Sequence, residues 1–196
     1  MNKTVWVLIG GVLMLLLLAV GSYNGLVQAD ESVNKSWSDV ESSYQRRMDL
    51  IPNLVETVKG AADFERGTLE AVTAARASVG KIQLSAAPTQ QELDQFLAAQ
   101  DQLGGALSRL LVTAEAYPQL TATQGFRDLQ AQLEGTENRI NVARRDFNEA
   151  VKDYNTRRRS FPAVLMAGIL GFEGRAGFQA QAGADQAPQV DFGGQP

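Results

Sequence analysis

The sequence predicts an all-α protein, in which an N-terminal transmembrane helix is followed by an antiparallel up-and-down four-helix bundle with long helices. Three observations lead to this prediction. The N-terminus carries a long apolar stretch, apolar residues recur every three or four positions through the rest of the chain, and aromatic residues make up only 7% of it. Val, Ile and Thr do not alternate with polar residues over any long stretch, which argues against a β-sheet.

The composition limits the classes of function. A chain of 196 residues has room for one domain of ordinary size, and its net charge of -4 gives no overall attraction to nucleic acid. The absence of His and Cys excludes Ser-His-Asp catalysis, Cys-His catalysis and disulfides. Di-iron sites in helical bundles also use His. We therefore expect no enzyme, no cofactor, no metal site, no small-molecule substrate and no nucleic-acid partner.

The segment from Thr4 to Tyr23 is predicted to cross a membrane. It carries no charge, and as a helix it spans about 30 Å, the thickness of the hydrocarbon core. Trp6 and Tyr23 lie near its two ends, where aromatic rings favour the membrane interface. The alternative is a cleaved signal peptide with Ala19-Val20-Gly21 as the cleavage site, but the apolar run is long for that role.

The charges that flank this segment predict its orientation. Lys3 and the terminal amine precede it, whereas mostly acidic residues follow it. The charged residues on the far side are Asp30, Glu31, Lys35, Asp39 and Glu41. The positive-inside rule then places the N-terminus in the cytoplasm and the bundle outside it.

Four apolar stripes at helical spacing predict the helices of the bundle. They run from Leu26 to Ile51, from Leu54 to Val79, from Leu93 to Tyr117 and from Phe126 to Tyr154. We expect a turn at Pro52, because proline lacks an amide hydrogen and disfavours a helical residue before it. A single kinked helix is the alternative, since the apolar stripe continues through Pro52 in register.

Capping residues and prolines predict the other boundaries. Gly80 is expected to end the second helix in a left-handed conformation, and Thr89 with Glu92 forms a capping box that starts the third. The remaining boundaries are the end of the third helix at Tyr117-Pro118, a cap of the fourth by Thr121 with Gln124, and the end of the fourth at Pro162.

A short apolar segment after the bundle is predicted to touch the membrane interface or a neighbouring subunit. Residues 161–172 reach only about 18 Å as a helix, too short to span a bilayer, and three arginines precede them. The alternative is a cap folded over the end of the bundle. The predicted interface residues are Arg157, Arg158, Arg159, Phe161, Leu165, Met166, Ile169, Leu170 and Phe172.

The chain thus divides into an anchor at 1–23, a bundle at 24–161, an apolar contact segment at 162–172 and a tail at 173–196. The tail is rich in Gly, Gln and Ala, a composition typical of flexible chains.

Several short motifs occur in a fixed order along the chain. They are Tyr23-Asn24-Gly25-Leu26, Trp37-Ser38-Asp39-Val40, the run from Gln45 to Val55, Val58-Lys59-Gly60, Phe64-Glu65, Ala75-Arg76, Glu115-Ala116-Tyr117-Pro118, the run from Leu133 to Ile140, Ala143-Arg144-Arg145, Tyr154-Asn155, Phe161-Pro162 and Gly171-Phe172. This order resembles the LemA family across nearly the whole chain, and the run from Arg46 to Gly60 is its strongest part.

The resemblance implies a bacterial inner-membrane protein with one N-terminal span and an up-and-down four-helix bundle, and it implies no established activity. Some relatives carry a lipoprotein Cys where this chain has Ser22, so no lipid can be attached here. Some descriptions of the family place the short N-terminus outside. Relatives also usually show His-Glu where this chain has Phe64-Glu65, which removes an acid/base candidate. Val190-Asp191-Phe192 resembles a tail motif of the family and suggests a docking peptide.

Charged and turn-forming residues beside the apolar stripes form a second candidate site. They are Arg46, Arg47, Asp49, Pro52, Asn53, Glu134, Glu137 and Arg144. One interpretation is a hydrogen-bonded layer that fixes helix register, and the other is a partner or peptide surface around Pro52.

The leading functional hypothesis is a non-enzymatic membrane-anchored scaffold that self-assembles and organises membrane or partner proteins. Its expected partners are membrane lipid, further copies of the chain and a membrane protein. The alternative is a monomeric accessory or adaptor module for a membrane protease or a signalling protein. A third hypothesis, a hydrolase with a carboxylate site, would depend on Glu65, Glu134 and Glu137.

Overall fold

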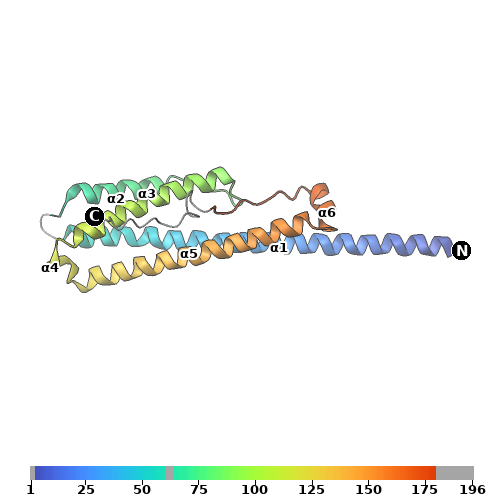
Figure 1. The fold of residues 1–196 in the computed structure, drawn as a ribbon, viewed down its shortest axis with the longest axis horizontal. Coiled ribbons are helices and arrows are strands. Elements are labelled where there is room, and N and C mark those ends of the chain that lie inside the picture. The colour runs from blue at the N-terminus through green and yellow to red at the C-terminus, as the bar shows by residue number, and fades with distance from the viewer. Residues whose placement is uncertain (1–2, 61–63, 180–196) are drawn as a thin grey trace, which may run out of the picture.

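The computed structural model describes residues 3–60 and 64–179, and these form six helices and no strand (Figure 1). The all-α prediction is therefore confirmed. The helices are α1 (Lys3–Lys59), α2 (Arg66–Val79), α3 (Gln90–Ala114), α4 (Pro118–Thr121), α5 (Gln124–Arg159) and α6 (Ala163–Leu170).

Helix α1 is a single helix that passes through Pro52, so the predicted turn there is wrong and the one-helix alternative holds. An internal proline costs a helix roughly 3 kcal/mol. Pro52 itself is exposed, whereas Ile51, Leu54 and Val58 are at most 1% exposed. Burying each of these side chains contributes about 1.5–3 kcal/mol, which together outweighs the lost hydrogen bond. The predicted second helix is consequently divided between the end of α1 and α2.

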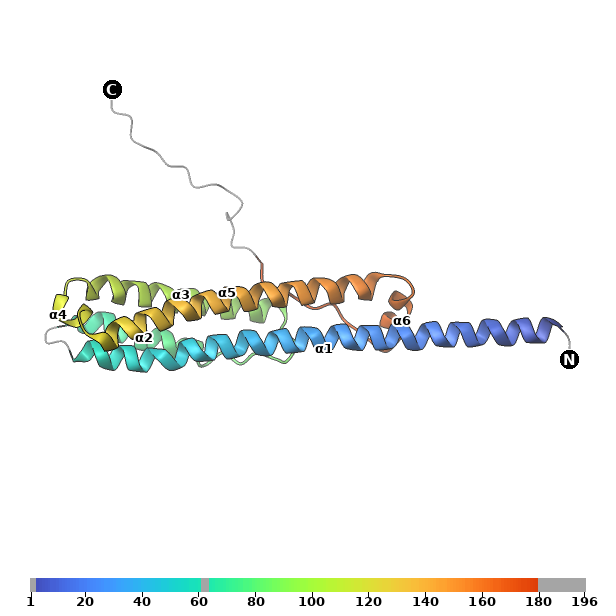
Figure 2. The same cartoon turned by 90° about the horizontal axis from the view of Figure 1, so that it is seen from below.

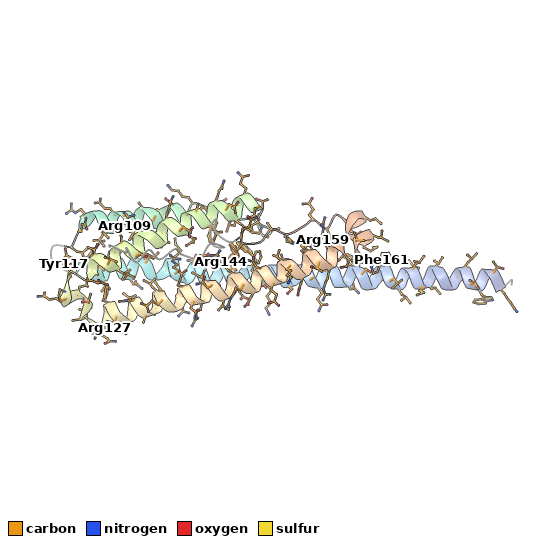
Figure 3. The ribbon with its side chains drawn as sticks, viewed as in Figure 1. Arg109, Tyr117, Arg127, Arg144, Arg159 and Phe161 are labelled. Atoms are coloured by element: carbon orange, nitrogen blue, oxygen red, sulfur yellow. The ribbon has the colours of Figure 1, made fainter. Side chains whose placement is uncertain are left out.

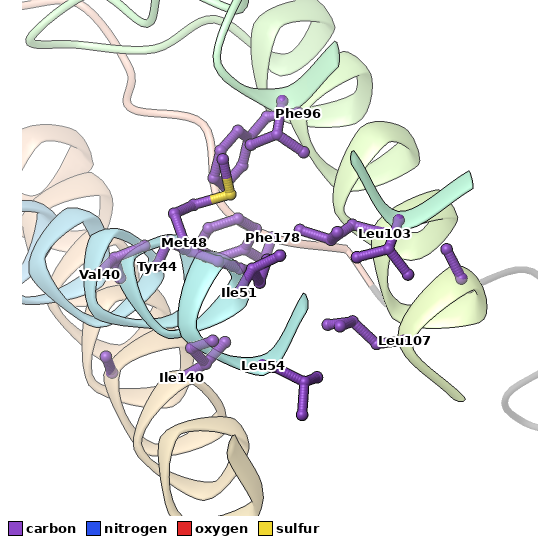
Figure 4. Packing of buried hydrophobic residues seen from close by; sticks show 14 of the residues in the cluster. Val40, Tyr44, Met48, Ile51, Leu54, Phe96, Leu103, Leu107, Ile140 and Phe178 are labelled. Atoms are coloured by element: carbon purple, nitrogen blue, oxygen red, sulfur yellow. The ribbon is translucent and has the colours of Figure 1, made fainter. Parts of the chain in front are cut away.

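The long helices α1 and α5 lie side by side, and α2 and α3 form a second pair beside them (Figures 1 and 2). The chain runs away from its N-terminal end in α1 and returns toward that end along α5. Figure 4 shows the apolar core between the pairs, where Ile51 and Leu54 of α1 lie near Leu103 and Leu107 of α3.

Two of the predicted caps lie at the predicted residues, but only one has the predicted conformation. The capping box is confirmed: the Thr89 hydroxyl accepts a hydrogen bond from the Glu92 amide at 3.2 Å, and the Glu92 carboxylate accepts one from the Thr89 amide at 2.7 Å. Gly80 is right-handed with φ -65°, so the left-handed prediction is wrong. Its amide donates to the Arg76 carbonyl, which closes the last turn without a change of hand.

Two further boundaries differ, and the end of the fourth helix before Pro162 agrees with the prediction. The third helix already ends at Ala114, and Pro118 instead begins the short α4, a position that suits proline. The cap of α5 is the Thr123 hydroxyl, which accepts a hydrogen bond from the Phe126 amide, and not Thr121. Helix α5 ends at Arg159, just before Pro162.

Residues 173–178, which we call the strap, belong to the predicted flexible tail, but they bind the helices. Their composition is therefore a poor guide to their structure. The Tyr154 hydroxyl donates to the Glu173 carbonyl at 2.7 Å. The Asn155 amide group donates to the Arg175 carbonyl at 2.8 Å and accepts from the Arg175 amide at 3.0 Å. The ring of Phe178 enters the core. The predicted motif Val190-Asp191-Phe192 lies outside the described residues.

Candidate functional site

The first candidate site begins with the N-terminal part of α1, which extends beyond the other helices (Figure 2). Its large apolar side chains from Trp6 to Leu18 are exposed, the most exposed being Leu17 at 74%. A contiguous apolar surface of this size marks contact with a membrane or another protein. In the described part of the chain, α1 is the one helix long and apolar enough to cross a membrane. It continues without a break past residue 23, where the anchor was expected to end.

We call the exposed apolar part of α1 from Trp6 to Leu18 the bare stretch. Helix α6 packs on both α1 and α5 near the end of the bare stretch. The ring of Phe172, just after α6, lies edge-on to Tyr23 with centroids 6.1 Å apart, so α6 sits level with the end of the predicted span. Ala167 is buried against the body. Gly171 ends the helix with φ +72°, a left-handed conformation that favours glycine.

The opposite side of α6 and the turn before it are apolar and exposed. Phe161 is 79% exposed and Ile169 is 77% exposed, and Leu165 and Leu170 are exposed beside them. Figure 3 shows Phe161 and Arg159 at the end of α5, where α1 leaves the body. Met166 and Phe172, which belong to the same predicted interface, are only half-buried. Two exposed apolar surfaces, one on α1 and one on α6, thus occur at the same end of the molecule.

The three consecutive arginines before α6 have different surroundings, although their sequence gives no reason to separate them. The Nε of Arg158 donates to the Phe172 carbonyl at 2.6 Å, and the Nε of Arg159 donates to the Asn155 carbonyl at 3.2 Å. Arg157 is exposed and lies over Gly25 of α1. The structure therefore assigns only Arg158 to holding the chain that follows α6, because the Arg159 contact lies within α5.

The second candidate site centres on Arg47, which is buried on α1 with 8% exposure. Its Nη1 donates to the Glu137 Oε2 of α5 at 3.0 Å. A Cβ at Gly104 of α3 would come within 3.2 Å of the Arg47 Nη2, so the glycine leaves room for the guanidinium. Arg47 therefore bridges α1 and α5 and is covered by α3.

A groove of about 410 Å³ opens beside this ion pair, and it brings together four of the eight residues predicted for this site. Arg47, Glu134, Glu137 and Arg144 all line it. The guanidinium of Arg144 also lies 4.7 Å from the centroid of the Phe178 ring, which ties the groove to the strap. The other four predicted residues do not line the groove: Arg46, Asp49, Pro52 and Asn53 are exposed on α1.

Gln100 of α3 also lines this groove, and sequence reasoning missed it. It is only 4% exposed, and neither its amide nitrogen nor its amide oxygen has a hydrogen-bond partner among the described residues. An unpaired buried polar group costs roughly 1–3 kcal/mol. The sequence did indicate that Gln100 is buried, because it occupies a position of the apolar stripe between Phe96 and Leu103.

Burial shifts the ionisation of one further groove residue. Burial raises the pKa of the Tyr44 hydroxyl above its ordinary value of 10.0, against the opposing charges of Arg144 and Arg47. Tyr44 therefore stays a neutral hydrogen-bonding group at neutral pH. Within residues 3–60 and 64–179, no cluster of three or more acidic side chains could hold a metal ion. Glu65, a carboxylate of the hydrolase hypothesis, is the residue that precedes α2.

A comparison with known protein families shows to which family this chain belongs. The model of the LemA family matches residues 36–192, so the match begins past the middle of α1 and includes all of the described chain after that point. This chain belongs to the LemA family. The LemA match includes the groove beside Arg47 and helix α6, begins after the exposed apolar stretch of α1, and continues beyond the strap to residue 192.

Individual relatives of this LemA-family chain are distant in sequence. Magnetosome protein MamQ 2 of Paramagnetospirillum magneticum is 26% identical, with 83% of this chain aligned to 66% of the relative. Magnetosome protein MamQ of Magnetospirillum gryphiswaldense is also 26% identical, with 77% aligned to 62%. Protein LemA of Metamycoplasma hominis is 23% identical, with 82% aligned to 70%. The chain thus spans just under two thirds of the length of the MamQ relatives.

Proposed function

We propose that this LemA-family protein is a non-enzymatic membrane-anchored scaffold that self-assembles and organises membrane or partner proteins. In this proposal α1 crosses the membrane, and α1, α2, α3 and α5 form an antiparallel four-helix bundle above it. The observation that carries the proposal is that the bare stretch of α1 and the exposed apolar side of α6 lie at one end of the molecule.

The position of α6 supports a second contact with the membrane besides α1. The contact of Phe172 with Tyr23 and the exposure of Phe161, Leu165 and Ile169 support the proposal that these side chains enter the interface when α1 spans the bilayer. Full burial of such a side chain contributes about 1.5–3 kcal/mol. Two attachments fix the body relative to the membrane surface, which favours lateral association of copies in one plane.

The similar proteins, magnetosome protein MamQ and protein LemA, are not named for any reaction, which supports a non-enzymatic role over a catalytic one. We propose the bacterial inner membrane as the location, with the N-terminus in the cytoplasm and the bundle in the periplasm. The support for this orientation is the positive charge of Lys3 before the span and the mainly acidic sequence directly after it.

The native size of the full chain tests the scaffold. Mass photometry in mild detergent and in lipid nanodiscs is expected to show a uniform particle of many copies. Replacing Leu165 and Ile169 by Glu should reduce its size while circular dichroism stays unchanged, because both side chains are exposed and lie outside the core. A monomer at every concentration in both detergent and lipid would overturn the proposal.

The groove beside Arg47 favours one second candidate, the monomeric adaptor. Leu97, Leu107, Leu111 and Leu133 supply an apolar lining, and the unpaired amide of Gln100 supplies hydrogen-bonding capacity that a bound peptide would satisfy. A photo-crosslinking amino acid at Ser108, a lining residue, tests this candidate against a matched position at the exposed Arg46. Capture of one defined partner from Ser108 alone, together with a monomeric native size, would replace the scaffold by the adaptor.

A further inference from the structure

A cleft of about 430 Å³ lies between α1, the end of α5 and the start of α6. Leu17, Leu18, Gly21 and Gly25 line its α1 side, and Arg157 and Pro162 line the opposite side. A Cβ at Gly21 would meet nothing within 4 Å, so this part of the cleft is open. The rest of the lining is Ser22, Thr156, Ser160 and Ala163, so the cleft combines a mainly apolar wall with a few hydroxyl groups and one cationic side chain.

The cationic group of this cleft is available for a ligand. Arg158 and Arg159 donate to backbone carbonyls of the chain, but the Arg157 guanidinium has no hydrogen bond or ion pair with any residue that the structure describes. Its Nη1 lies 3.8 Å from the position of a Cβ at Gly25. The guanidinium therefore lies against Gly25 at one side of the cleft, where it can meet the anionic group of a flexible occupant.

The level of the cleft relative to the proposed membrane matches the two parts of a phospholipid. Leu17 and Leu18 lie within the predicted span, where acyl chains are found, and Gly25 lies just beyond Tyr23, where headgroups begin. A phosphodiester is an anion whose oxygens accept hydrogen bonds from a guanidinium in a bidentate manner. Along the direction out of the membrane, the apolar wall of the cleft therefore comes before the cation, just as the acyl chains of a phospholipid come before its phosphate.

We infer that this cleft binds a membrane glycerophospholipid, with the phosphodiester on Arg157 and one acyl chain along Leu17 and Leu18. The inference rests on the proposed membrane location, and it adds a defined lipid site to it. Phosphatidylglycerol binds more tightly than phosphatidylcholine, because choline carries its own cation into a region that already holds Arg157, Arg158 and Arg159.

Native mass spectrometry of the full chain in detergent, titrated with phosphatidylglycerol, tests the site. Arg157→Gln is expected to weaken lipid binding at least about tenfold, as loss of a charge-assisted bidentate contact does. Arg159→Gln is the matched control, because it removes the same charge two residues away and should change binding less than about twofold. Gly25→Leu fills the cleft and should also abolish binding without a change in charge.

Each of the other outcomes has a definite meaning. Equal losses in the Arg157 and Arg159 variants would overturn the site, since they would show only general surface charge. Displacement of the lipid by millimolar glycerol phosphate would reassign the cleft to soluble phosphates. Formation of a dimer that Gly25→Leu dissolves would reassign it to a second copy of α1. The proposed membrane location fails separately, if the wild-type chain does not float with phosphatidylglycerol vesicles in a density gradient.

Discussion

Arg175 and Asp30 form a bidentate ion pair between the strap and α1, although 145 residues separate them in sequence. The Nη2 of Arg175 lies 2.7 Å from one carboxylate oxygen and 2.9 Å from the other, and its Nε lies 2.9 Å from the first. Both side chains are about four-fifths covered, at 20% and 23% exposure. This pair fixes the strap to the part of α1 that directly follows the bare stretch.

Removing the charge of Asp30 is therefore expected to release the strap. Asp30→Asn should lower the free energy of unfolding by about 1–3 kcal/mol, because the partly buried Arg175 loses its counter-charge. Hydrogen exchange of residues 172–179 should accelerate more than exchange in α3. The control is Glu56→Gln, which breaks the exposed pair with Lys59 and should cost less than about 1 kcal/mol. Equal exchange of the strap in both variants would contradict this role.

Replacing the unpaired amide in the groove should stabilise the protein. Gln100→Leu is expected to raise the free energy of unfolding by about 1–3 kcal/mol, because it removes a buried polar group that has no partner among the described residues. Leu103→Ala, three residues away and fully buried, should lower it by about 2–5 kcal/mol. Chemical denaturation measures both changes. A destabilising Gln100→Leu would show that the amide makes a favourable interaction in solution.

Charge reversal separates the two interpretations of the arginine pair on α1. Arg47→Glu should destabilise the fold by about 3–5 kcal/mol, because it puts an unpaired negative charge beside Glu137 in a buried position. Arg46→Glu changes the neighbouring exposed residue and should stay within about 0.5 kcal/mol. Thermal unfolding monitored by circular dichroism measures the difference. Similar stability of both variants would favour a partner surface over a register-fixing pair.

The capping box predicts a change of stability with pH. Hydrogen bonds from the backbone and side chain of Thr89 hold the pKa of the Glu92 carboxyl below its ordinary value of 4.5. The stabilising contribution is present above that ordinary value and is lost as the pH falls through the lowered folded-state pKa. Thr89→Ala should cost about 1 kcal/mol at neutral pH and should reduce the loss of Tm below pH 4.5. Glu92→Gln should flatten the same acidic limb, and an unchanged limb in both variants would disprove the assignment.

The orientation of the body can be measured directly, because the chain has no cysteine. Gln132→Cys places a single thiol on an exposed position of α5. A membrane-impermeant maleimide is expected to label it in intact spheroplasts, as a periplasmic bundle requires. Labelling that appears only after lysis would place the body in the cytoplasm instead. Cysteine at the exposed Arg127 should give the same result, since it lies on the same helix.

Local sequence patterns predicted the helices well where apolar periodicity and capping agree. The capping box at Thr89 and the continuous stripe through α3 are examples. The pattern failed at Pro52, because the residue's local preference for a turn is weaker than the burial of Ile51, Leu54 and Val58 around it. A stripe that stays in register across a proline is therefore stronger information than the proline itself.

The candidate sites were predicted only in part, because several decisive contacts are not local. Composition marked residues 173–178 as flexible, yet Asn148, Tyr154 and Asn155 supply side-chain hydrogen bonds to that backbone. Nothing in the run Arg157 to Arg159 distinguishes its members, and only the path of α6 assigns them different roles. The lipid interface and the partner groove remain predictions.

Because α1 is unbroken, its proposed membrane span and the part beyond the membrane tilt together. About 36 residues separate Tyr23 from Lys59, so the far end stands about 54 Å above the point where α1 would leave the bilayer. If the span tilts by about 20° to suit a thinner membrane, that end moves sideways by about 18 Å. Because α1 is continuous from the proposed span to Lys59, a small change in bilayer thickness would become a large sideways displacement of the end that lies farthest from the membrane.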